Sequence, residues 1–175
     1  MEPDPVLADE LIASHYEQLK TIARAKRRRM RSGQTLQTTD LLHEGWLKLR
    51  KQRQWKSESH FMRTAALAMR QVIVDYARSK HAEKRGGGVP DLNYADVEDI
   101  LPEYGETPEQ IVIIGDLMNK LAEKDPRLAE IVDLRYFSGF TADETANILR
   151  VTDRTVRRQW TIARAWLAAE LQDGK

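Results

Sequence analysis

The stretch TADETANILRVTDRTVRRQWTIARAWL (141–167) decides the fold, because it reads as two helices joined by a tight turn. Its first half begins with Thr141, followed three residues later by Glu144, a pair that forms a capping box at a helix start. Wound as a helix, the second half places apolar residues on one face and arginines on the other. The apolar face holds Val156, Trp160, Ala163 and Leu167, widened by Ile162 and Trp166, and the opposite face holds Arg154, Arg157, Arg158, Thr161 and Arg164.

A helix, a tight turn and a basic helix are the order of a helix-turn-helix motif. The small residue, turn residue and β-branched residue of such a motif fall on Ala146, Arg150 and Val156. Arg150 stands where glycine is usual, so we expect a left-handed residue at a cost of about 1 kcal/mol, or a differently shaped turn. In a DNA complex the major groove would receive Arg154, Thr155, Arg157 and Arg158. Taken alone, such a helix is equally well read as a solvated charged face.

Charge is unevenly distributed, although the 175 residues carry a net charge of only +1. Residues 1–85 hold 18 Lys and Arg against 10 Asp and Glu, 86–149 hold 4 against 14, and 150–175 hold 6 against 3. This pattern favours a chain that touches a polyanion at both ends, or two lobes that attract each other and hide their basic faces. The absence of cysteine excludes disulfides and thiolate metal sites. No apolar run reaches signal-peptide or membrane-span length, so we expect a cytoplasmic protein without a membrane partner.

Helical periodicity dominates the chain, so we expect an all-α protein of two small helical domains. The segment RGGGVPDLNYADVEDILPEYGETP (85–108) breaks this periodicity with a glycine triplet, three prolines and several acids. Such a composition indicates a flexible linker, and we expect the domains at 1–85 and 107–175 with the linker at 86–106. Further helices are expected at 7–23, from 38–40 to about 49, and at 61–84, 111–121 and 128–137.

Two blocks of the chain resemble bacterial sigma factors. The block 121–171, which contains the helix-turn-helix, resembles region four, the part that reads the minus-35 promoter element. TTDLLHEGWLKL (38–49) resembles regions 2.1–2.2, and FMRTAALAMRQVIVDYARSKHAEKRGGG (61–88) resembles regions 2.3–2.4. Two such regions without region one or three resemble the extracytoplasmic-function (ECF) group of the sigma-70 family. The closing glycine triplet is similar to that of one subgroup.

The resemblance implies an alternative sigma factor, which is not an enzyme and needs no cofactor. Such a protein binds core RNA polymerase through the β′ clamp coiled coil and the β flap, and directs promoter recognition, melting and transcription initiation. At the positions that match the docking helix of region 2.2, polymerase binding is implied for Asp40, Leu41, Glu44 and Trp46. An anti-sigma factor or a Ser/Thr kinase is the kind of partner that would control the activity of such a protein.

The family pattern D-A-E-D-L-x-Q-E corresponds here to QTTDLLHE (37–44), so Gln37 and Thr39 replace two acids. We therefore expect weak docking until phosphorylation of Thr39 or Thr38 supplies negative charge. In the alternative interpretation Asp40 and Glu44 suffice, and the threonines are ordinary helix caps.

The helix expected at 61–84 supplies a second DNA surface. Its basic residues lie outside the apolar stripe and suit the phosphates of the melted minus-10 strand: Arg63, Arg70, Arg78, Lys80, Lys84 and Arg85. Trp55 lies where the family has a loop that captures a flipped base. It is equally well read as an anchor of the core.

Alternative interpretations concern the linker, the C-terminal motif and the polar side chains. The acids of the linker could follow a basic channel of the polymerase or simply keep the segment solvated. A self-contained helix-turn-helix regulator would share the C-terminal motif, but residues 38–85 would bind neither polymerase nor single-stranded DNA. An enzyme has little support, because no nucleophile with a base and no phosphate loop stands out. His43 and His60 have no second ligand at metal spacing, so no metal is expected.

Overall fold

The computed structural model describes Val6, Leu7, Glu10 and residues 13–15, 38–51, 54–83 and 107–173. The linker expected at 86–106, Lys84, Arg85 and most of the expected first helix lie outside these residues. The fold is all-α, as predicted, apart from a short pair of antiparallel strands, β1 (Val6–Leu7) and β2 (Gln54–Trp55). The helices are α2 (Thr38–Arg50), α3 (Glu58–Glu83), α4 (Pro108–Lys124), α5 (Pro126–Val132), the π-helical turn η2 (Asp133–Phe137), α6 (Ala142–Leu149) and α7 (Asp153–Asp173).

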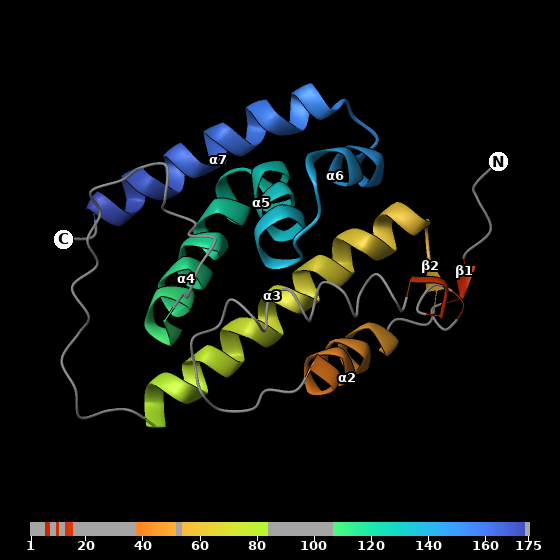
Figure 1. The fold of residues 1–175 in the computed structure, drawn as a ribbon, viewed down its shortest axis with the longest axis horizontal. Coiled ribbons are helices and arrows are strands. Elements are labelled where there is room, and N and C mark those ends of the chain that lie inside the picture. Colours follow the sequence, from red (N-terminus) through yellow and green to blue (C-terminus); the bar gives the residue numbers. More distant parts are fainter. Residues whose placement is uncertain are drawn as a thin grey trace.

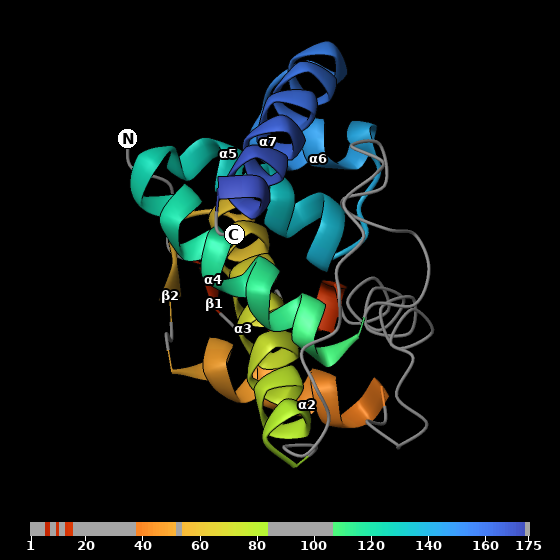
Figure 2. The same ribbon diagram turned by 90° about the vertical axis from the view of Figure 1, so that its left-hand side faces the viewer.

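The long helix α3 lies at the centre of the molecule. In both views α2 lies on one side of it and α4, α5 and α6 lie on the other, with α7 outermost (Figures 1 and 2). A single apolar cluster runs from Phe61 and Ile73 of α3 to Met118, Leu121 and Phe137. We call α2 and α3, before the expected linker, the first lobe and residues 107–173, after it, the second lobe. The two lobes share one core in this conformation.

Local signals explain where the helices of the second lobe begin. Thr107 caps α4 in a capping box with Gln110, and the side chain of Asp125 accepts two backbone hydrogen bonds at the start of α5. The capping box predicted for Thr141 and Glu144 is confirmed at α6. These caps fix the residues at which the three helices begin.

The helix predicted at 128–137 has an irregular end. After α5 the chain makes one wider turn, η2, in which Ser138 N donates to Asp133 O at 3.0 Å. Gly139 then ends the element with a φ of 74°, a conformation that favours glycine. Since a π-turn holds an extra residue, it changes the direction of the side chains beyond it.

The helices α3 and α4 approach each other closely at Gly115. A Cβ atom at this position would lie 2.7 and 2.8 Å from the two methyl groups of Val74. Any other residue would have to move α4 or Val74, so the glycine permits the close contact of the two lobes.

Candidate nucleic-acid interface

The helix-turn-helix has the geometry that its sequence predicts. Arg150 adopts the left-handed conformation, with φ 54° and ψ 48°, so the turn keeps its usual shape despite the arginine. Ala146 and Val156 are buried together in a small cluster. Thr152 caps the start of α7 (Asp153–Asp173), because its Oγ1 accepts from Thr155 N at 3.2 Å.

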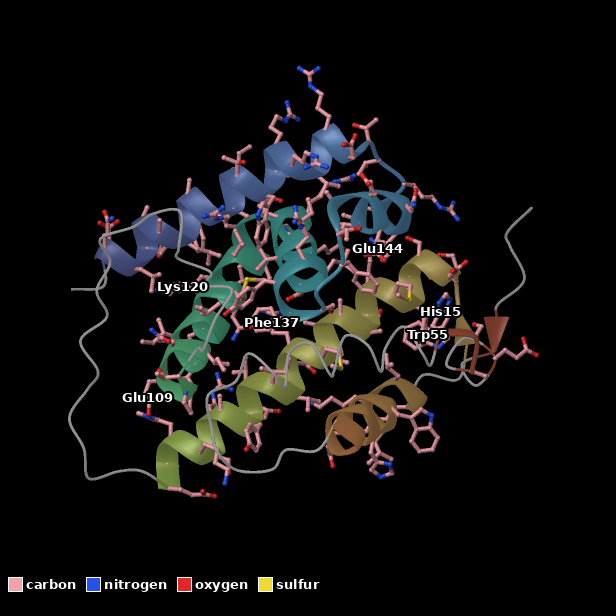
Figure 3. The ribbon with its side chains drawn as sticks, viewed as in Figure 1. His15, Trp55, Glu109, Lys120, Phe137 and Glu144 are labelled. Carbon is pink, nitrogen blue, oxygen red and sulfur yellow. The ribbon has the colours of Figure 1, made fainter. Side chains whose placement is uncertain are left out.

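The N-terminal end of α7 presents its arginines to solvent. Arg154, Arg157 and Arg158 are exposed, and nitrogen-tipped side chains extend outward there (Figure 3). Arg157 Nε lies 3.3 Å from Asp153 Oδ2 of the same helix. Thr155 is half-buried, with its hydroxyl 2.9 Å from that of Thr152. The three arginines are thus open to a polyanion.

Two details of this surface differ from the sequence prediction. Ile162, which was expected to widen the apolar face, is 49% exposed, because the face packed on α5 is narrower than the periodicity indicates. Arg135 was missed, and its guanidinium carbon lies 5.0 Å from the ring centroid of Trp160. Burial, with Arg157 and Arg164 nearby, lowers the pKa of Arg135. The basic surface formed by the arginines of α7 therefore continues onto η2 through Arg135. Only the contact with Trp160 in the folded chain could reveal this extension.

The arginines of α3 face acids of the second lobe rather than open solvent. Arg78 Nη2 lies 2.7 Å from Asp116 Oδ1 of α4, and Arg63 Nη1 lies 3.0 Å from Glu130 Oε1 of α5. At the C-terminal end of α3, Lys80 pairs with Glu83 at 2.9 Å within the helix.

Arg70 is the main departure from the expected track. Although it lies outside the expected apolar stripe, the residue is only 6% exposed in this conformation. Its Nε lies 3.0 Å from Oδ1 of Asp133, which is 5% exposed, although the pair lacks hydrogen-bond alignment. Burial raises the pKa of Asp133 to about 7, against the opposing effect of Arg70. The reason for the difference is that η2 covers this part of α3.

A pocket of about 310 Å³ adjoins this ion pair between α3 and the second lobe. Its polar lining comes from His60, Arg63 and Arg70 on one side and Glu130 and Asp133 on the other. Burial, together with Arg63 and Lys56, lowers the pKa of His60. The interface between the lobes is therefore closely packed around Gly115, but it contains this pocket beside Arg70.

Trp55 is an anchor of the core in this conformation, one of the two roles considered for it. It is 1% exposed and packs edge-on against His60 and Phe61, each with ring centroids 5.3 Å apart. His15 stacks on Phe61 and lies 3.0 Å from Glu58, at the same end of the molecule (Figure 3). A role in base capture would require Trp55 to be uncovered.

The helix α2 carries the residues expected to bind polymerase. Glu44 is exposed and Trp46 is half-exposed, with its ring 5.9 Å from that of His43. Leu47 beside them is 42% exposed. The backbone of Thr38, Thr39, Asp40 and Leu41 is helical, and their side chains lie outside the described part. An apolar and acidic surface thus lies on the side of α2 away from α3.

In the parts of the chain that the structure describes, no helix is long and apolar enough to cross a membrane, and no group of three or more His, Asp or Glu side chains could hold a metal ion. A comparison with curated proteins and one with solved structures find no match. The model of the ECF sigma factor family matches residues 2–173, nearly the whole chain, including both lobes. The chain therefore belongs to the ECF sigma factors, alternative sigma factors that bind core RNA polymerase and promoter DNA and direct transcription initiation.

Proposed function

We propose that the two lobes read separate promoter elements, with sigma region 2 at 1–85, a linker at 86–106 and region 4 at 107–175. The observation that carries this proposal is the exposed arginine end of α7, on a helix-turn-helix whose turn and cap are both formed. The glycine triplet at 86–88 would place the chain in the corresponding subgroup of the family.

In this proposal α7 contacts the minus-35 element. Arg154, Arg157 and Arg158 are free to reach guanine edges or phosphates in the major groove, and Thr155 stands at the same helix end. Because they occupy the first turns of α7, they can enter the groove without a change in the fold.

The basic residues of α3 contact the minus-10 region in the transcribing complex. Arg63, Arg70 and Arg78 succeed one another along the helix and suit the phosphates of a single strand. Lys80, Lys84 and Arg85 extend this track at its C-terminal end, and Trp55 lies near its start.

Polymerase docking is assigned to α2, through Asp40, Leu41, Glu44 and Trp46. Thr38 and Thr39 occupy the first turn of α2, where the helix dipole favours negative charge. A phosphate on Thr39 or Thr38, added by a Ser/Thr kinase, would supply about −1.5 to −2 there. Docking on the basic surface of the β′ coiled coil is thereby strengthened.

One experiment tests the general function. The purified chain is reconstituted with bacterial core RNA polymerase, and the transcripts from genomic DNA are sequenced. We expect a set of start sites that depends on the chain, with little promoter binding by the chain alone. A clear operator footprint without polymerase, and no chain-dependent starts with it, would instead identify a self-contained regulator.

A second experiment tests the switch at α2. Thr39→Glu should bind core polymerase more tightly than the native chain, and Thr39→Ala should not. Asn119→Glu, at an exposed position of α4, is the control for an added charge elsewhere. If Thr39→Glu binds no better than Thr39→Ala, phosphorylation does not supply the missing acids.

A further inference from the structure

Four side chains of α3 are held by four acids of the second lobe. Besides the pairs of Arg63, Arg70 and Arg78, the ring of His81 lies 3.1 Å from Glu109 Oε1 of α4. Figure 3 shows Glu109 beside the C-terminal end of α3. The pairs extend from residue 63 to residue 81, about 27 Å along the helix. Together, Glu109, Asp116, Glu130 and Asp133 form a row of negative groups, here called the acid row.

The acid row occupies the side chains that the proposed promoter contacts need. Arg63, Arg70 and Arg78 are the first three residues of the minus-10 track, and each has a carboxylate within 3.0 Å. A carboxylate and a backbone phosphate compete for the same guanidinium donors. DNA and the acid row therefore exclude each other on α3.

The contact between the lobes is also apolar and close. The methyl groups of Val74 on α3 pack against the backbone of Gly115 on α4, where a side chain would leave no room for them. Met118 and Leu121 of α4 belong to the same apolar cluster as Ile73 of α3. At the N-terminal end of α3, the hydroxyl of Ser59 donates to the carbonyl of Ile148 at 2.5 Å. Charge attraction alone would not place α4 this near to α3.

The closed arrangement is too small to read two promoter elements at once. The minus-35 and minus-10 elements are separated by about 25 base pairs, or about 85 Å of duplex. A compact chain of this length has a radius of gyration of about 16 Å, so its diameter is about 40 Å. Fully extended, the segment 84–106 could span about 75 Å, enough to let the lobes separate.

We propose that the second lobe is an internal cover of α3, whose acid row takes the place of promoter phosphates until the lobes separate on polymerase. This inference rests on the proposed promoter contacts of α3. The occupant of the α3 surface in the free protein is a named part of the same chain, residues 108–137. Separation exposes Arg70, which is buried in the closed form.

The cover can be locked by a disulfide. A Cβ at Gly115 would lie 3.3 Å from the Cβ of Val74, close to the roughly 3.5–4.5 Å found in disulfides. The native chain has no cysteine, so Val74→Cys/Gly115→Cys introduces the only two thiols. The double variant is oxidised, freed of oxidant and mixed with core polymerase, and its transcripts are compared with those of the same sample after reduction. Val74→Cys alone is treated identically as the control.

We expect the disulfide to form and the oxidised double variant to lose at least ten-fold in chain-dependent transcripts, with recovery on reduction. The single variant should not respond to oxidation. The inference is overturned if the fully oxidised chain transcribes like the reduced one, or if the folded chain does not form the bond. Absence of chain-dependent transcripts from the native protein would instead overturn the proposed function.

A second set of variants needs no cysteine. Asp116→Asn/Glu130→Gln removes two members of the acid row, and Glu123→Gln/Asp173→Asn removes equal charge from exposed sites of the same lobe that show no contact with α3 among the described residues. The free chain is titrated with a single-stranded oligonucleotide from a promoter found by transcript sequencing. We expect about five-fold tighter binding for the first pair and less than two-fold for the second. Equal effects of both pairs would show that only net charge matters and would overturn the cover.

Discussion

The arginines of α7 and those of α3 have different surroundings. On α7, Arg154 and Arg158 extend into solvent, and Arg157 pairs with Asp153, one turn earlier on its own helix. On α3, by contrast, Arg70 meets Asp133 across the interface between the lobes and is buried there. The comparison teaches that one residue type at helical spacing can form an accessible DNA surface or a covered one, depending on its neighbours.

The largest expected effect comes from breaking the buried pair. Above pH 7, where Asp133 is ionised, Asp133→Ala leaves the charge of Arg70 buried without its partner, so the free energy of unfolding should fall by about 3–5 kcal/mol. Urea unfolding followed by tryptophan fluorescence measures it. The double variant Arg70→Met/Asp133→Leu should stay within about 1 kcal/mol of the native chain. Equal losses in the two variants would mean that packing, and not the unpaired charge, is responsible.

The pH dependence of stability sharpens the same contrast. Because the pKa of Asp133 is raised to about 7, the folded chain keeps a proton that the unfolded chain has released. The stability from this proton is present below about pH 4 and is lost as the pH rises toward 7, by at most about 1.4 kcal/mol per pH unit. Urea unfolding at several pH values compares the native chain with Asp133→Asn. The free energy of unfolding of the native chain minus that of Asp133→Asn should fall as the pH rises. A rise in this difference would contradict the raised pKa of Asp133.

The exposed arginines of α7 should behave in the opposite way. Arg158→Ala should weaken promoter binding by the polymerase complex about ten-fold, as expected for one lost base or phosphate contact. Its free energy of unfolding should change by no more than about 0.5 kcal/mol. Arg127→Ala, an exposed arginine of α5, is the control and should leave promoter binding unchanged. A filter or mobility assay on a promoter with its minus-35 element measures the difference.

The smallest effects are expected at the two left-handed residues near the helix-turn-helix. Arg150→Gly should raise the free energy of unfolding by about 0.5–1 kcal/mol, because glycine adopts a positive φ without strain. Gly139→Ala should lower it by a similar amount, since the change is the reverse. Thermal unfolding of both variants tests this, and a shift of the same sign in both would contradict the argument.

Local signals made the helix-turn-helix predictable. The capping box of Thr141 and Glu144, the spacing of Ala146 and Val156 and the arginine face of α7 all lie within one short stretch. Their geometry depends on neighbours a few residues away in the sequence. The family resemblance, confirmed by the match over residues 2–173, then supplied the function.

The surroundings of α3 were not predictable in the same way. Periodicity showed which residues lie outside its main apolar stripe, but not which element covers them. A signal was present, because Val74 and Ala77 are buried outside that stripe, on the side of the helix that also carries Arg70, and give α3 a second apolar face. Arg70 lies among them, and only the distant Asp133 explains its burial.

The π-turn η2 also has a consequence for changes in chain length. It holds one residue more than an α-helical turn, so deleting one residue there would restore the regular spacing up to the end of the helix. Such a deletion would turn the end of the helix by about 100° and move Phe137, which is fully buried, away from its place in the core. A single residue of length thus decides which side of this helix end faces the core, independently of any side chain that touches DNA.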